Sequence, residues 1–157
     1  MPEKKEFEDF AKSIGYRPKN VQYLMEAFDF QKIHSRGDGV HRVNYANSAM
    51  ATVGDAVLKL VLAEHYYESS EDKGGITTKK ASEENDAVQS MVAERSGFMK
   101  LRYDETDSHP NNDQLPSGEK ATSTLFEAVV YAIYKDIGLD GVRKWVIDWY
   151  MPTAKKE

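Results

Sequence analysis

Apolar residues recur at helical spacing along most of the chain, in segments separated by glycine, proline and polar turns. Side chains three and four positions apart share one face of a helix, so this spacing predicts amphipathic helices. The expected helices span about residues 7–14, 20–28, 47–67, 77–85, 86–96, 122–137 and 141–150. No run shows the sustained alternation typical of a strand. The pattern therefore predicts a single all-α domain, residues 1–157.

Glycines mark several of the expected helix ends, because a left-handed backbone can close a helix. Those that directly follow a helical pattern are Gly15, Gly97 and Gly138. Gly74-Gly75 is expected to break the chain before a helix that Thr77 or Thr78 caps. Residues 34–43 are predicted to form a link, and residues 103–119 the longest loop.

Composition excludes several classes of protein. With 157 residues, 40% of them hydrophobic and 30% charged, the chain can bury a core without covalent staples. It has no cysteine, and its four histidines lack the spacing of zinc ligands. The longest apolar stretches, 57–62 and 125–134, are interrupted by charge and shorter than the roughly 20 residues of a membrane helix. The first residues lack an apolar leader, so we expect a cytoplasmic protein without a membrane segment.

Charge is distributed unevenly around a net value of −5. The segment 103–119 holds acids and no Lys or Arg; the acids are Asp104, Glu105, Asp107, Asp113 and Glu119. Residues 73–102 hold more bases than acids, so an RNA-facing patch could lie there. The acidic segment opposes RNA binding, so we expect it either to swing away when RNA binds or to contact a basic protein partner that helps to present the RNA.

The long helix at about 47–67 carries an acid, Asp55, away from its expected apolar stripe. That stripe consists of Met50, Val53, Val57, Leu60 and Val61. Asp55 shares its own face with small and apolar residues, among which an unpaired carboxylate is costly to bury. Two interpretations stay open: a partly exposed acid hydrogen-bonded to a neighbouring helix, or a metal ligand in a crevice.

A second acid, Glu127, lies off the apolar face of the helix at about 122–137. That face consists of Leu125, Phe126, Val129, Ala132 and Ile133. The simplest interpretation of Glu127 is a solvated helix residue. Spacing alone does not pair it with Asp55.

Five motifs, in order between residues 14 and 138, resemble the ribonuclease III family. The segment 47–58, with Gly54-Asp55-Ala56-Val57-Leu58, is similar to the family's signature helix. The other four are 14–28, Gly74-Gly75-Ile76-Thr77 with Lys80, Asn85-Asp86-Ala87, and 125–134. The resemblance implies an all-α endonuclease domain that dimerises and cuts double-stranded RNA with Mg²⁺. It also implies that Asp55 and Glu127 lie together at the metal.

The departures from the family pattern concern its acids. The resemblance expects glutamates where this chain has Ser48 and Ala51, and an aspartate where it has Thr124. Two of the usual four acids remain, a pattern similar to Mini-III, the short bacterial class without a double-stranded-RNA-binding domain. Thr52 stands where many members insert an aromatic residue into the partner, so a dimer with weaker anchoring is expected there.

The leading hypothesis is a magnesium-dependent endoribonuclease acting on double-stranded or structured RNA, with Mn²⁺ as a possible substitute. Asp55 and Glu127 are the candidate catalytic and metal-binding residues, with Asn47 and Thr124 orienting waters. The candidates for RNA phosphate contacts are Lys79, Lys80, Lys100 and Arg102. The alternatives are a noncatalytic RNA-binding or ribosome-associated protein on the same fold, and a purely structural dimer.

Overall fold

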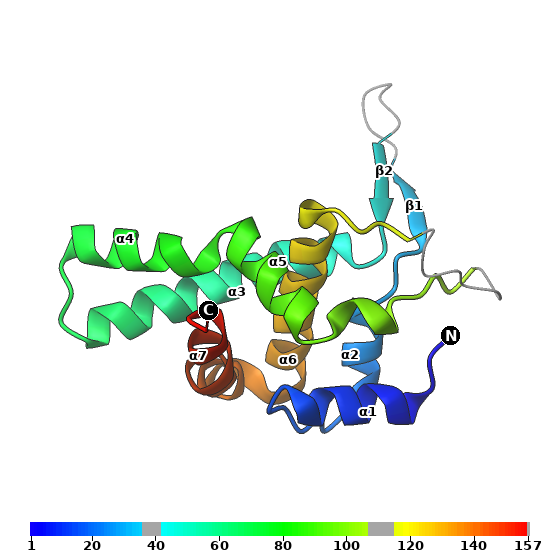
Figure 1. Ribbon diagram of the computed structural model, residues 1–157, viewed down its shortest axis with the longest axis horizontal. Helices are drawn as coiled ribbons and strands as arrows, with labels where there is room; N and C mark the ends of the chain where they lie inside the picture. The colour runs from blue at the N-terminus through cyan, green and yellow to red at the C-terminus, as the bar shows by residue number, and fades with distance from the viewer. Residues whose placement is uncertain (36–41, 107–114, 157) are drawn as a thin grey trace.

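The computed structural model describes residues 1–35, 42–106 and 115–156. The predicted all-α class is confirmed, because helices make up most of the described chain (Figure 1). The elements in order are α1 (Lys4–Ser13), α2 (Val21–Ala27), β1 (Lys32–Ser35), β2 (Arg42–Tyr45), α3 (Ser48–Glu68), α4 (Lys73–Glu84), α5 (Asp86–Arg95), η1 (Phe98–Leu101), α6 (Glu119–Trp145), η3 (Val146–Tyr150) and α7 (Met151–Ala154). None of the helices within these ranges is long and apolar enough to cross a membrane.

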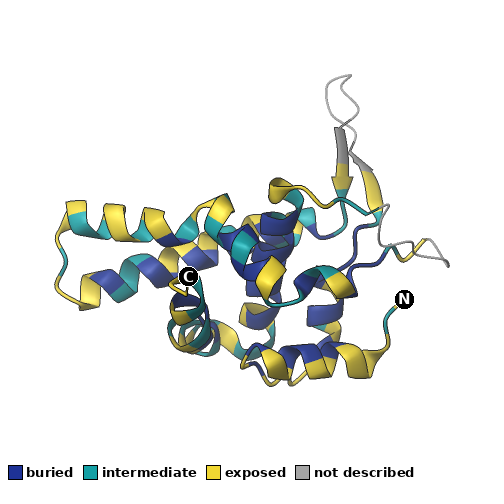
Figure 2. Ribbon diagram, viewed as in Figure 1, coloured by how far each residue is buried: buried dark blue, intermediate teal, exposed yellow. Residues whose placement is uncertain are grey.

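Helix α6 lies at the centre of the molecule and packs against α2, α3 and α5 (Figure 1). Between Thr122 and Ile133 every residue except Thr124 and Tyr131 is buried, as the dark blue of the helix in Figure 2 shows. Gly138 has φ 80°, so the helical conformation is interrupted where the sequence predicts a helix end. The chain then resumes helical geometry as far as Trp145. A helix covered on several sides buries polar positions together with apolar ones, which matters for Glu127.

Helices α3 and α4 lie side by side as a hairpin that extends from the rest of the molecule (Figure 1). Helix α4 begins at Lys73, because the side chain of Asp72 caps it by accepting a hydrogen bond from the N–H of Gly75. The predicted break at Gly74-Gly75 and the predicted cap at Thr77 or Thr78 are therefore wrong. The Thr77 hydroxyl instead donates to the carbonyl of Lys73 inside the helix.

A small antiparallel hairpin occupies part of the predicted link. Strands β1 and β2 pair in a register that sets Lys32 opposite Tyr45 and Ser35 opposite Arg42. Each strand has four residues, which is too short for a detectable alternating pattern. The prediction that this link holds no strand is wrong, although the two strands leave the fold class unchanged.

The buried side of α3 differs from the predicted apolar stripe. Val57 and Val61 are buried as expected, but Val53 is 43% exposed and Leu60 is 51% exposed. The buried residues of α3 are Ala51, Gly54, Val57, Leu58, Val61, Leu62 and Tyr66. Val53 and Leu60 instead belong to an exposed strip of α3, which also includes Ala49, Thr52, Ala56 and Tyr67 and which we call the open strip.

Candidate active site

Helices α3 and α6 approach each other closely at Gly54. A Cβ atom added to Gly54 would lie 1.7 Å from the backbone oxygen of Glu127, which no real side chain tolerates. The absence of a side chain thus lets the backbone of α3 rest on the backbone of α6 at this point. Asp55, the next residue along α3, is thereby brought beside Glu127.

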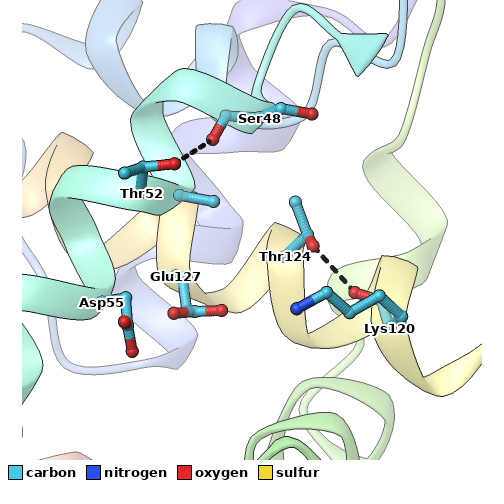
Figure 3. Close-up of a pocket in the computed structure, with 7 residues that line it drawn as sticks. Ser48, Thr52, Asp55, Lys120, Thr124 and Glu127 are labelled. Atoms are coloured by element: carbon cyan, nitrogen blue, oxygen red, sulfur yellow. Dashed lines mark hydrogen bonds between the residues drawn. The ribbon is translucent and has the colours of Figure 1, made fainter. Parts of the chain in front are cut away.

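Asp55 and Glu127 share a cleft of about 320 Å³ between the two helices. The remaining lining residues are Ser48, Ala51, Thr52, Lys120 and Thr124. In Figure 3 the two carboxylates, from different helices, lie next to each other, and the side chain of Lys120 points from α6 toward Glu127, with Thr124 near it. The structure therefore joins two acids that spacing alone could not pair.

The Glu127 carboxyl group lies in a desolvated environment. The residue is 7% exposed, so the interpretation of Glu127 as a solvated helix residue is wrong. The pKa of Glu127 is raised to about 8, mainly by burial and also by the hydrogen bond and negative charge of Asp55. A nearby cation would remove this penalty, because it favours the ionised form of both acids.

Asp55 lies nearer to solvent and has an ionic partner on its own helix. Its side chain is 36% exposed, and Oδ2 lies 3.0 Å from Nζ of Lys59, one turn later. The hydrogen bond and charge of Asp55 raise the pKa of Lys59. This matches the first interpretation of Asp55, a partly exposed acid, and it also leaves the carboxylate accessible from the cleft.

The two candidates for orienting water differ in position. Thr124 lines the cleft, and its hydroxyl donates to the carbonyl of Lys120 at 2.8 Å. Asn47 is fully buried at the start of α3, does not line the cleft, and donates from Nδ2 to the carbonyl of Ala27. Asn47 therefore ties α3 to the end of α2, and the geometry gives it no contact with the site. Ser48 lines the cleft as well, and its oxygen accepts the N–H of Tyr45.

One base in the cleft was missing from the sequence-based candidates. Lys120 lines the cleft, and its Nζ lies 3.8 Å from Oδ2 of Asp86. Lys120 precedes Glu127 by seven residues, a spacing that sets two side chains on one face of a helix. This seven-residue spacing is the sequence feature from which the position of Lys120 near Glu127 could have been predicted. The charge of Lys120 also acts to lower the pKa of Glu127.

The four predicted phosphate contacts do not gather in the cleft. Lys79 is exposed, pairs with Glu71 and lies 5.8 Å from the ring centre of Tyr66. Lys80 pairs with Glu84 at 3.3 Å, and Lys100 is exposed on η1. Arg102 is 7% exposed, and its guanidinium donates to the carbonyls of Met99 and Pro116. Arg102 thus holds two chain segments together, and this burial contradicts its assignment as an RNA contact.

The ligands available in the cleft fit a magnesium ion. Mg²⁺ is commonly held by one or two carboxylates, with water and substrate phosphate completing the octahedron. Asp55 and Glu127 supply two carboxylates, and within the described ranges no group of three His, Cys, Asp or Glu side chains is placed to hold a metal. The buried carboxyl group of Glu127, whose raised pKa disfavours ionisation beside Asp55, is the feature that a cation would stabilise in its charged form.

Sequence comparisons identify the family. The model of the ribonuclease III domain matches residues 48–138, more than half of the chain. The chain belongs to the ribonuclease III domain family. Ribonuclease 3 of Bdellovibrio bacteriovorus is 32% identical over 154 residues, which cover 91% of this chain and 60% of that protein. Ribonuclease 3 of Pseudothermotoga lettingae is 31% identical and is covered over 63% of its length, against 94% of this chain.

The fold also matches solved ribonuclease III nuclease domains. The nuclease domain of ribonuclease III from Campylobacter jejuni superposes with a TM-score of 0.73 at 19% identity, covering 98% of this chain and 99% of that one. A second structure of that domain, described for flexibility in a region involved in dimer formation, has a TM-score of 0.71. The chain spans about 55% to 63% of the length of several curated relatives that it matches. It therefore corresponds in size to the nuclease domain of the Campylobacter protein.

Proposed function

We propose that this ribonuclease III domain is a magnesium-dependent endoribonuclease that hydrolyses phosphodiester bonds in double-stranded or structured RNA. The observation that carries the proposal is the pairing of a buried Glu127 with Asp55 in one cleft. Two adjacent carboxylates, one with a raised pKa, form a site that is unfavourable without a cation. Mn²⁺ prefers similar oxygen ligands, so we expect it to substitute.

The residues of the cleft would divide the work by position. Asp55 and Glu127 would hold the ion, which supplies an activated water and offsets charge on the scissile phosphate when bound. Lys120, whose side chain points toward Glu127, would attract the phosphate into the cleft. The oxygens of Ser48 and Thr124 would accept or relay hydrogen bonds from water. Gly54 would keep the two acids at their working separation.

A noncatalytic RNA-binding protein on the same fold is the second candidate. The observation that favours it is that Ser48, Ala51 and Thr124 all line the cleft, at positions where the resemblance expects acids. Two carboxylates suffice for one magnesium ion but offer few ligands for a second. Activity with wild-type protein decides between the candidates.

We also propose a homodimer that forms through the open strip of α3. Val53 and Leu60 expose large apolar surfaces there, and Tyr67 is 73% exposed at the end of the same strip. Thr52 belongs both to the open strip and to the cleft lining, so a second copy on this strip would stand beside the cleft. The Thr52 hydroxyl bonds the carbonyl of Ser48 and leaves only a small methyl group for contact.

The RNA and protein contacts outside the cleft rest on charge. Lys79, Lys80 and Lys100 remain our candidates for phosphate contacts, and binding should weaken steeply with salt. A basic protein partner remains a proposal based on the acidic segment 103–119, of which residues 107–114 lie outside the described chain.

The direct test is cleavage of long double-stranded RNA by the purified chain with Mg²⁺ and with EDTA. We expect cleavage with Mg²⁺ only, and loss of at least roughly a thousandfold in rate for Asp55→Asn and for Glu127→Gln. Glu119→Gln, an exposed acid on the same helix, is the matched control and should cleave normally. Circular dichroism checks that the variants keep their helices. Wild-type protein that binds RNA without cleaving it would support the noncatalytic candidate instead.

A further inference from the structure

A second cavity, of about 400 Å³, lies between the α1–α2 turn and the last part of α6 with η3. One wall is aromatic: Trp145 and Trp149 stack with ring centres 5.2 Å apart and planes 16° apart. Trp145 is 4% exposed and fixed by a hydrogen bond from its indole N–H to the carbonyl of Ile14. Trp149 is partly exposed, and Ile137 extends the apolar surface. The wall is therefore held in place by stacking on Phe98 and Phe126, and Trp149 rather than Trp145 supplies its exposed part.

Two glycines keep this wall uncovered. A Cβ atom on Gly15 would lie 3.6 Å from Cδ1 of Trp149, and one on Gly141 would lie 2.5 Å from Cγ1 of Ile137. Gly15 also has φ +73°, a conformation that other residues rarely adopt. A side chain at either position would occupy or disturb the space next to the wall.

The rim of the cavity carries charged side chains that form no ion pair with other described residues. Arg17 and Lys144 line it and are exposed, and neither forms an ion pair within 4.0 Å in the described chain. Asp148, also on the rim, is likewise exposed and without an ion pair among those residues. The cavity thus combines the partly exposed ring of Trp149 with two cations and one hydrogen-bond acceptor.

We propose that this cavity binds a nucleotide, with its base against the tryptophan wall and its phosphate at Arg17 and Lys144. Aromatic side chains hold bases of any sequence through their flat faces and edges. Arginine and lysine bind phosphate through charge-assisted hydrogen bonds. Asp148 accepts an N–H of the base. A volume of about 400 Å³ falls within the range of small-ligand pockets.

The nucleotide site is separate from the candidate active site. It shares no lining residue with the cleft of Asp55 and Glu127, and on α6 it begins ten residues after Glu127, at Ile137. The inference therefore does not rest on the proposed RNA cleavage. The ligand can be a free nucleotide or the terminal nucleotide of an RNA strand, because both present a base and a phosphate.

The chain offers a direct spectroscopic readout, since its two tryptophans both line this cavity. We would titrate the four nucleoside 5′-monophosphates, to about 1 mM, and monitor fluorescence excited selectively at tryptophan. Equilibrium dialysis with labelled nucleotide measures binding independently. Short single-stranded oligonucleotides with and without a 5′-phosphate form the second arm. A saturable fluorescence change with either probe supports the site, and the probe that binds more tightly identifies the source.

Three variants locate the binding. The double variant Arg17→Gln with Lys144→Gln should weaken binding by about tenfold, because both phosphate contacts are lost. The matched control, Arg95→Gln with Lys5→Gln, removes the same charges from other surfaces and should bind normally. Glu127→Gln should also bind normally, because it changes only the cleft.

Three results would overturn the proposal. The first is the absence of saturable binding of all probes by both fluorescence and dialysis. The second is equal affinity in the Arg17 and Lys144 double variant and its control. The third is an affinity that Glu127→Gln changes in either direction, since the nucleotide would then occupy the cleft.

Discussion

Helix α3 has one side packed against α6 and another side exposed to solvent. On one side Gly54 lets the backbone touch α6, and the neighbouring Asp55 meets the buried Glu127. On the other side the open strip presents Val53 and Leu60 to solvent. The first side is packed within one chain, and only the buried carboxyl group of Glu127 is unfavourable to ionise there. The second is apolar and lacks a covering element in the described chain.

This difference shows that the two sides of α3 are each incomplete, in different ways, within the described chain. Burial disfavours the charged form of Glu127 in the cleft, even though Lys59 pairs with Asp55, and the open strip has no apolar partner among the described residues. A cation would stabilise the charged form of Glu127, and a second copy of the chain would cover the open strip. Thr52 lies on the boundary, so events on the two sides are close enough to influence each other.

Gly54→Ala should have the largest effect on the packed side. Its Cβ would collide with the carbonyl of Glu127, so α3 and α6 must separate. We expect a loss of about 3 kcal/mol in the free energy of unfolding and a loss of cleavage, because the two acids move apart. Urea unfolding and the cleavage assay measure these effects. Gly74→Ala, in an exposed helix with ordinary contact distances, should leave stability unchanged or raise it slightly. Equal stability of both variants would show that the contact at Gly54 is not required.

The pH dependence of stability tests the charge on the packed side. A pKa of Glu127 raised to about 8 means that the folded chain retains a proton that the unfolded chain releases near its ordinary pKa. Stability of the metal-free protein should therefore fall as the pH rises from about 5 to 8, by roughly 1.4 kcal/mol for each pKa unit of difference. Glu127→Gln stays neutral and should lose most of this dependence. Thermal unfolding across this pH range, with EDTA present, measures the pH dependence of stability. The same pH dependence in the wild type and in Glu127→Gln would contradict a raised pKa of Glu127.

Leu60→Glu tests the open strip. Because Leu60 is half exposed, the variant should keep the stability of the monomer within about 0.5 kcal/mol. The new charge should weaken self-association by about tenfold or more, since it would be buried against a second copy. Sedimentation velocity over a concentration series measures this. Lys5→Glu, on α1, introduces the same side chain elsewhere and should associate like the wild type. A wild-type protein that stays monomeric at high concentration would eliminate the dimer.

The helices followed from the sequence because apolar spacing is a local property. Gly138 ended a predicted helix and does interrupt α6, whereas Gly74-Gly75 lies inside α4 because Asp72 caps that helix. Spacing also identified Val53 and Leu60 as a stripe, but periodicity does not state which neighbour covers a stripe. The exposure of these two residues depends on the position of α6, which no local pattern contains.

The candidate site depended on a different kind of information. Glu127 is buried because α6 is surrounded by other helices, and its own helix gave no sign of this. The resemblance to a family, rather than residue spacing, implied its meeting with Asp55. Arg102 carries a positive charge that suggested RNA binding, yet its carbonyl partners at Met99 and Pro116 come from the folded turn. Lys120 was predictable from its seven-residue spacing to Glu127.

Metal binding in the absence of RNA tests the central claim most directly. Calorimetric titration of the wild-type chain with Mg²⁺ and Mn²⁺ at pH 7, in two buffers of different ionisation enthalpy, measures affinity and proton release together. Because the pKa of Glu127 is raised to about 8, we predict that binding releases most of one proton. Glu127→Gln should bind more weakly and release none. Absence of binding to the wild type, or identical affinity and proton release in both proteins, would contradict a metal site formed by Asp55 and Glu127.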